Sequence, residues 1–185
     1  MSTIPGADIL AVSAKVMAED GGKPQMILLR VPTSLPGVSV EAAQQMGARA
    51  HCLGSVKLDQ VRVPVTATLG QEGEGKALMY ARFNVSRCLS PLAALGSARG
   101  VLNETIDFAR NRQVFGRPIG INQSISFPIV EHHTRIEAAR LLAYRALVAN
   151  DHGVDASADA AMAKWFGIST GVSVIQDCLQ MFGAQ

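Results

Sequence analysis

The stretch "NRQVFGRPIGINQSISF", residues 111–127, decides how the second half of this chain folds. It separates two long segments with helical apolar periodicity, at about 77–112 and 123–150. Connections between helices are usually short, but this one contains two arginines, two phenylalanines, two glycines, two glutamines and a proline. The mixture indicates a connection that does more than reverse the chain.

Three side chains in this connection allow two interpretations. An arginine at the end of a helix is favoured by the helix dipole, and Phe115 beside Gly116 can be an aromatic plug in a turn. Alternatively, Arg112, Phe115 and Gln123 form a ligand clamp, in which a fork-shaped cation binds a phosphate or pyrophosphate beside a ring and an amide. Spacing alone favours the plain turn.

Outward from the connection, the chain reads as an antiparallel array of three long helices. The third helix is expected at about 158–182, after a turn-rich segment in which Asp155 or Ser157 can cap it. Pro91 is expected to kink or loosen the first helix. Three helices leave an apolar stripe exposed unless a fourth completes the bundle.

Gly96 and Gly100 lie one turn apart in the first helix. Small residues at this spacing let another backbone come close. A ligand could use the same gap, but a close helix crossing is the favoured interpretation.

The chain before residue 70 has a different pattern. Strands are expected at 7–16, 25–31 and 54–63, and "EDGGKP" at 19–24 contains a strong hairpin signal. Three or four strands are too few to close a barrel. The predicted fold class is therefore α+β, with a partial antiparallel β-domain at 1–70 and a long-helix antiparallel bundle at 71–185.

Composition excludes several classes of protein. Hydrophobic residues make up 48% of the chain and charged residues 17%, which argues against disorder. The net charge of +2 is not concentrated in a basic run, so nucleic acid is not an expected partner. No apolar run approaches the length of a membrane span. Three widely spaced cysteines and the absence of a signal-peptide pattern favour a reducing compartment, the cytoplasm.

Other reactive side chains favour structural interpretations. His132 and His133 are adjacent on a helix and point about 100° apart, so they cannot chelate one metal well. Trp165 and Phe166 are expected in the core or in a subunit contact. Cys88 is expected to pack inside the helices. No metal site is predicted.

The helix–loop–helix resembles that of the acyl-CoA dehydrogenase family. The family pattern is Arg-x-x-Phe-Gly-(Lys/Arg)-x-(Ile/Leu), then Gln, then a long helix with Glu and Ala-Arg. The matching residues here are Arg112, Phe115, Gly116, Arg117, Ile119, Gln123, Glu137, Ala139 and Arg140. Residues 57–75 are similar to the end of the family's middle β-domain, and 179–184 to the start of its Gln-x-x-Gly-Gly-x-Gly motif.

The resemblance implies flavin chemistry on an acyl-CoA thioester, with FAD as the cofactor. A carboxylate takes the α proton and the flavin takes the β hydride. It also implies an oligomer (a dimer or tetramer, of like or unlike chains) that shares FAD sites, with electron-transferring flavoprotein as the acceptor. The residues implied to contact the ADP part of a neighbouring subunit's FAD are Arg112, Phe115, Gln123, Gln180 and Gly183. Asn84 and Arg87 are implied to lie near CoA, and Ser2 near the flavin ring.

Departures from the family pattern affect catalysis. The usual catalytic Glu falls beyond Gln185, and at the alternative position, just before Arg87, this chain has Ser86. Ala184 replaces the second glycine of the glycine motif. The chain is therefore expected to be a partial dehydrogenase, inactive alone. The alternatives are a non-catalytic partner subunit that supplies FAD and CoA contacts to a catalytic homologue, and a degenerate product without function.

Overall fold

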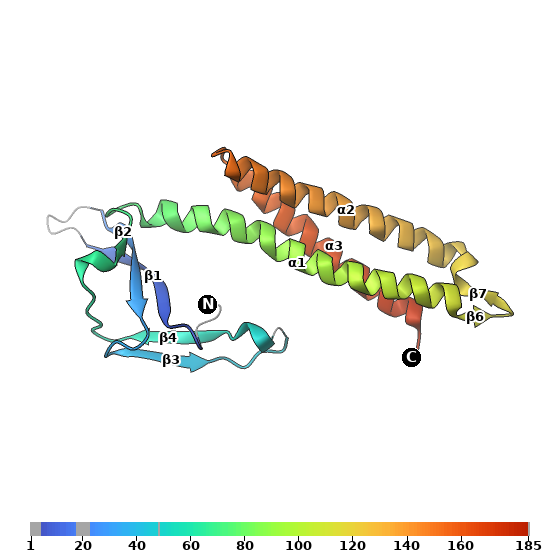
Figure 1. The fold of residues 1–185 in the computed structure, drawn as a ribbon, viewed down its shortest axis with the longest axis horizontal. Coiled ribbons are helices and arrows are strands. Elements are labelled where there is room, and N and C mark those ends of the chain that lie inside the picture. Colours follow the sequence, from blue (N-terminus) through green and yellow to red (C-terminus); the bar gives the residue numbers. More distant parts are fainter. Residues whose placement is uncertain (1–4, 18–22, 48, 185) are drawn as a thin grey trace. The chain divides into compact units, whose positions relative to one another are not determined.

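The computed structural model describes residues 5–17, 23–47 and 49–184 (Figure 1). Contacts divide the chain into two compact units, Met1–Ala81 and Arg82–Gln185. This division falls inside the first long helix, whereas the domain boundary predicted from the sequence lies before it. Each unit is described below by itself.

The first unit contains two small antiparallel sheets. In one, β1 (Ile9–Val16) pairs with β2 (Gln25–Pro32), and β5 (Thr68–Leu69) pairs with the same β2. Alternate residues of β1 are exposed and half-buried, as the sequence pattern predicted. The predicted hairpin signal at 19–24 lies largely outside the described residues.

The second sheet corrects the sequence prediction in two places. It pairs β3 (Val38–Ala42) with β4 (Gly54–Leu58). The strand predicted at 54–63 is wrong beyond Leu58, because Gln60 has φ +48° and takes the backbone out of the extended region. Sequence analysis missed β3, which is short and exposed along most of its length. Short 3₁₀ helices at Arg49–His51 and Val65–Ala67 complete the unit.

Three long helices make up most of the rest of the chain (Figure 1). They are α1 (Gly75–Asn111), α2 (Gln123–Asp151) and α3 (Ser157–Phe182), each within two residues of the predicted bounds. The α+β class is thus confirmed. Helix α1 continues through Pro91, whose side chain is fully buried. A hairpin of β6 (Gln113–Val114) and β7 (Arg117–Pro118) and a 3₁₀ turn (Ile119–Ile121) join α1 to α2.

The core of the second unit uses side chains from all three helices. Small residues alternate with branched ones, which lets the helices approach closely. The buried cluster consists of Leu95, Ala98, Leu102, Ile136, Ala139, Val174 and Cys178. The N-cap of α3 is Ala156, so the prediction of Asp155 or Ser157 as the cap is wrong, although the Asp155 carboxylate accepts a hydrogen bond from the Ser157 amide at 3.0 Å.

The close helix crossing predicted at Gly96 and Gly100 is wrong. Both glycines are exposed, and a Cβ added at either would meet nothing within 4 Å. The crossing is instead at Gly167 and Gly171 of α3, where a Cβ added at Gly167 would lie 2.5 Å from the Cβ of Pro91. Two glycines four residues apart do form a close crossing in this chain, but they are Gly167 and Gly171 of α3 rather than Gly96 and Gly100 of α1.

This crossing can be tested with a matched pair of alanine variants. We expect Gly167→Ala to lower the free energy of unfolding by about 1–3 kcal/mol, because the new methyl group overpacks the contact with α1. We expect Gly96→Ala, in open space on a helix, to raise it by up to about 1 kcal/mol. Urea unfolding followed by circular dichroism measures both, and equal effects would show that α3 does not cross α1 at Gly167.

Candidate functional site

The hairpin between α1 and α2 presents an aromatic ring at its tip. Val114 pairs with Arg117, and the two residues between them, Phe115 and Gly116, have φ of +53° and +76°. Two consecutive positive φ values are typical of a type I′ hairpin turn. A phenylalanine is uncommon in this conformation, and its side chain is 101% exposed. The interpretation of Phe115 as a plug is therefore wrong, since the ring fills no space in the described part of the chain.

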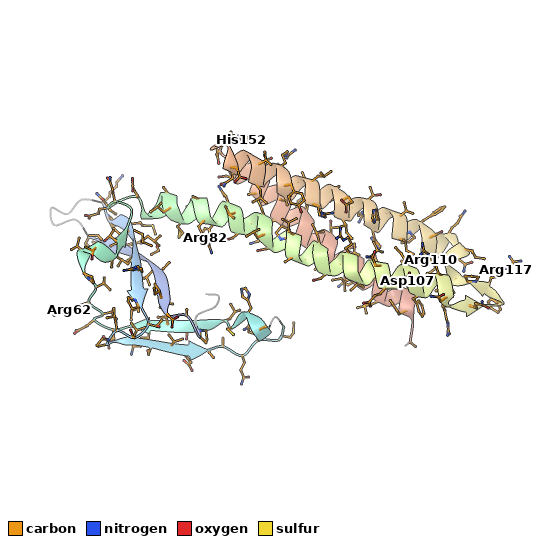
Figure 2. All side chains as sticks on the ribbon, viewed as in Figure 1. Arg62, Arg82, Asp107, Arg110, Arg117 and His152 are labelled. Carbon is orange, nitrogen blue, oxygen red and sulfur yellow. The ribbon has the colours of Figure 1, made fainter. Side chains whose placement is uncertain are left out.

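The backbone of Arg112 is held by two hydrogen bonds, whereas its side chain forms no ion pair with the described residues. Its amide donates to the Phe108 carbonyl at 2.8 Å, and its carbonyl accepts from the Ile119 amide at 2.9 Å. Its exposed guanidinium makes no ion pair with the described residues. Arg110, two residues earlier, instead lies 3.8 Å from Asp107; both are labelled in Figure 2.

The end of α3 is tied to the end of α1. The rings of Phe108 and Phe182 stack with centroids 4.5 Å apart. Helix α3 then stops at Gly183, which has φ +71° and donates its amide to the Gln180 carbonyl at 3.2 Å. Gln180 and Gly183 are both exposed. The stacked pair therefore places them at the same end of the unit as the hairpin (Figure 1).

The structure thus gathers five predicted residues at one end of the helical unit. We call this surface the hairpin end, defined by Arg112, Phe115, Gln123, Gln180 and Gly183. It offers an unpaired guanidinium, an exposed ring and two exposed amide side chains. Gln123 is also the first residue of α2, where the amide groups of the helix favour an anion. A ligand that carries both phosphate and a flat apolar group fits this set of donors.

The residues predicted near CoA form a separate network. Arg87 Nη1 donates to Asn84 Oδ1 at 3.1 Å, and Asn84 Nδ2 donates to Ser157 Oγ at 3.1 Å. Asn84 and Arg87 are half-buried. Ser157 begins α3 and Gln180 is near its end, so about 35 Å of helix separates this network from the hairpin end. One chain does not bring the two predicted sets together.

A groove beside Arg87 was missed by sequence analysis. It has a volume of about 500 Å³ and is lined by Arg87, Ala161, Lys164, Trp165, Ile168 and Ser169. Trp165 is 75% exposed, which excludes the core position, while the other predicted alternative, a subunit contact, stays a prediction. Its neighbour Phe166 packs against the core, as predicted. The groove is thus lined by an indole and two cationic side chains.

The comparisons with known proteins agree on one family. The model of the acyl-CoA dehydrogenase C-terminal domain matches residues 73–185. The chain belongs to the acyl-CoA dehydrogenase family. It is 33% identical, over 96% of its length, to an acyl-CoA dehydrogenase of Bacillus subtilis, and covers 47% of that protein. This family member thus spans about half the length of the curated relatives it matches.

Solved structures of similar proteins have the same fold. Butyryl-CoA dehydrogenase from Megasphaera elsdenii superposes with a TM-score of 0.91 at 28% identity, over 99% of this chain and 48% of that one. A structure of PigA with FAD and proline gives a TM-score of 0.88 at 29% identity, with the same coverage of both chains.

Two residues that the family resemblance singled out have distinct outcomes here. Ser86, at the alternative position of the family's base, donates its hydroxyl to the Arg82 carbonyl at 3.1 Å. Ser2 lies outside the described residues and stays a prediction.

His132 is buried, with Nε2 3.1 Å from Asp177 Oδ2. Among the described residues, no group of three His, Cys, Asp or Glu side chains could hold a metal ion. None of the described helices is long and apolar enough to cross a membrane.

The cysteines of this acyl-CoA dehydrogenase family chain give a testable contrast. Cys88 and Cys178 are buried and Cys52 is exposed. Burial, with a smaller contribution from Asp159, raises the pKa of the Cys88 thiol, and burial also raises the pKa of Cys178. We expect a disulfide reagent at pH 8 to modify Cys52 of the native protein quickly, and Cys88 and Cys178 only after unfolding.

The same shifts give a pH dependence with a definite sign. Both folded-state pKa values are raised, so the stabilisation by the two thiols is complete below their unfolded pKa, about 8.5. It is lost as the pH rises further. Cys88→Ser with Cys178→Ser should remove this alkaline loss of stability, measured by urea unfolding between pH 7 and 10. An unchanged pH profile would contradict the assignment.

Proposed function

We propose that this chain is part of an FAD-dependent acyl-CoA dehydrogenase and that its hairpin end binds the ADP part of FAD. The observation that supports the proposal most directly is the unpaired Arg112 guanidinium beside a fully exposed Phe115 ring. Family membership supplies the chemistry, and PigA, a relative of similar fold, is known with FAD. When bound, FAD accepts a hydride from the β-carbon of an acyl thioester.

Each residue of the hairpin end has a role in this proposal. Arg112 would hold the pyrophosphate through its two-pronged donor geometry. Phe115 would cover the flat face of the adenine, because an exposed ring loses its water on stacking. The amides of Gln123 and Gln180 would bond the remaining polar atoms. Gly183 lacks a side chain and would let the ADP approach the end of α3.

We further propose that the hairpin end serves a flavin held mainly by a neighbouring subunit. Dehydrogenation needs the cofactor and the thioester at one site. The Asn84–Arg87 network, proposed to lie near the CoA part of an acyl-CoA, is about 35 Å along α3 from the hairpin end. The two surfaces would therefore belong to different active sites of a dimer or tetramer. Electron-transferring flavoprotein is the proposed acceptor.

The 185-residue chain alone is proposed to be inactive. Ser86 offers a hydroxyl, already bonded to a backbone carbonyl, where the family's alternative position needs a carboxylate. With Ala184 in the glycine motif, Ser86 also favours a second function, a non-catalytic partner that lends its hairpin end to a catalytic homologue. Co-purification with a longer homologous chain would favour this second function.

The ADP clamp can be tested with two neighbouring arginines. We expect Arg112→Ala to weaken ADP binding to the 185-residue chain about tenfold, since a hydrogen bond to a charged group contributes about 1.5–3 kcal/mol. Arg110→Ala removes the same charge two residues away, where Asp107 already pairs it, and should change the affinity less than about twofold. Titration calorimetry with ADP measures both. Equal losses of ADP affinity in the two variants would show that ADP is attracted by the net positive charge of the surface and not by Arg112 in particular.

Inactivity alone is tested by turnover. The chain with added FAD, an acyl-CoA and an artificial electron acceptor should reduce the acceptor no faster than free FAD does. Steady turnover above that background would show that the chain holds a base of its own.

A further inference from the structure

Helix α2 buries an ionisable side chain to which the proposed function gives no role. His132 is 3% exposed, and its Nε2 atom lies 3.1 Å from Oδ2 of Asp177 on α3. Both ring nitrogens are buried, and neither makes a well-aligned hydrogen bond with the described residues. The polar group that the described chain brings closest to this imidazole is therefore the carboxylate of Asp177.

Stability alone does not favour a histidine at this position. A buried polar group without a hydrogen bond costs free energy that an apolar side chain of similar size avoids. The other buried residues of α2 are apolar, namely Ile136, Ala139, Ala143 and Ala146. What distinguishes His132 from them is the carboxylate beside it.

The His132–Asp177 pair lies close to the hairpin end. Asp177 is six residues before Gly183, or about 9 Å along α3. His132 is nine residues after Gln123, or about 14 Å along α2. The contact therefore joins the two helices within about three turns of two residues that are proposed to bind ADP.

Other contacts attach the end of α3 to α1. Phe182 stacks on Phe108, and Cys178 is buried beside Thr105. Neither of these contacts involves α2. Among the described residues, the contact with His132 is thus the polar contact that holds this end of α3 against α2.

Asp177 adds a negative charge at an end of α3 that is already negative. The C-terminal end of a helix carries a partial negative charge, and α3 has no basic residue in its last turn. Gln180 and Gly183 follow Asp177 within about two turns of the same helix. Because the phosphates of ADP are anionic, an uncompensated carboxylate here opposes the binding proposed for these two residues.

His132 can compensate this charge from inside the protein. The buried polar side chains of the described chain are Thr105, His132 and Thr170, so no other charged group in that part of the chain shares the core. Cys178, next to Asp177, stays neutral because burial raises the pKa of its thiol. The charged or titratable side chains that flank this region on α1 and α2 are exposed, and they are Glu104, Asp107, Arg110, Glu131, His133 and Arg135.

We propose that His132 is a positioning residue for the hairpin end, an inference that rests on the proposed function. Through Asp177 it holds the end of α3 against α2, so that Gln180 and Gly183 face the ADP. When the imidazole takes up a proton from solvent, it also cancels the charge of Asp177, and ADP binds more tightly. By reciprocity, bound ADP favours the protonated imidazole.

The pH dependence has a definite sign. Histidine is the side chain that changes charge between about pH 5 and 8, whereas aspartate stays ionised over this range. Asp177 is 54% exposed, so the pair can exchange a proton with solvent. The affinity for ADP should therefore gain as the pH falls, by about threefold for one charge cancelled roughly 10 Å from the phosphates. Without the carboxylate, burial disfavours the charged imidazole and the gain is lost.

Titration calorimetry with ADP at pH 8 and pH 5.5 tests the proposal on the 185-residue chain. Since the phosphates of ADP titrate in every sample, each variant is compared with the wild type at the same pH. His132→Leu should bind ADP more weakly at both pH values, with a deficit about threefold larger at pH 5.5. Asp177→Asn, which leaves the core intact, should show the same change of deficit with pH. It decides the question if His132→Leu does not fold.

The neighbouring histidine provides a matched control. His133 is exposed, so His133→Gln should bind ADP like the wild type at both pH values. At pH 6.5, calorimetry in two buffers of different ionisation enthalpy measures the protons taken up with ADP. The wild type and His133→Gln should take up more than His132→Leu does. A merely structural role of His132 would leave this proton uptake unchanged.

The outcomes separate this inference from the ADP clamp. A deficit of His132→Leu or Asp177→Asn that is equal at both pH values, or equal proton uptake in all variants, would overturn the role of His132 and leave the clamp in place. So would a His133→Gln variant that behaves like His132→Leu. Absence of ADP binding by the wild type at either pH would overturn the clamp and, with it, the role of His132.

Discussion

The contact between Gly167 of α3 and Pro91 of α1 sets the arrangement of the helical unit. Without a side chain at Gly167, the two helices approach closely enough to bury the proline ring, and their relative position along the axis is fixed there. Farther along the same pair of helices, Phe182 then meets Phe108. The end of α3 therefore reaches the hairpin because the crossing near the middle of α3 fixes the register of the two helices.

The hairpin combines local backbone strain with an exposed ring at the surface proposed to bind ADP. Phe115 has a backbone conformation that glycine or asparagine would adopt with less strain, and its ring contacts nothing that repays the cost within its own unit. Stability alone does not favour this residue. An exposed ring on a tightly hydrogen-bonded support is preorganised for a ligand or a partner chain, because little freedom remains to be lost on binding.

Much of the fold could be predicted from the sequence, because helical periodicity over more than twenty residues is a strong local signal. The bounds of α1, α2 and α3 followed from it. The errors arose where tertiary contacts decide. Which of the two glycine pairs forms the crossing depends on the helix that faces it. Whether Trp165 is buried depends on whether another element of the fold covers its indole.

The candidate site stays a prediction, and it was made from residue types rather than from their places in the fold. The family resemblance identified the hairpin-end residues, and the Phe108–Phe182 stack explains how α3 joins them. Neither the helical periodicity nor the family resemblance predicted the hydrogen bonds from Arg87 to Asn84 and from Asn84 to Ser157. Side-chain hydrogen bonds between residues far apart in the sequence leave no periodic trace, so they had to be seen in three dimensions.

The separation of the two surfaces along α3 has a genetic consequence. If flavin and thioester contacts of one active site come from different copies, a defect in the hairpin end of one allele and a defect near Arg87 in another do not damage the same sites. A mixed assembly of the two defective chains would retain some sites in which both halves are intact. Two inactive alleles would then complement each other, whereas two alleles damaged at the same surface would not.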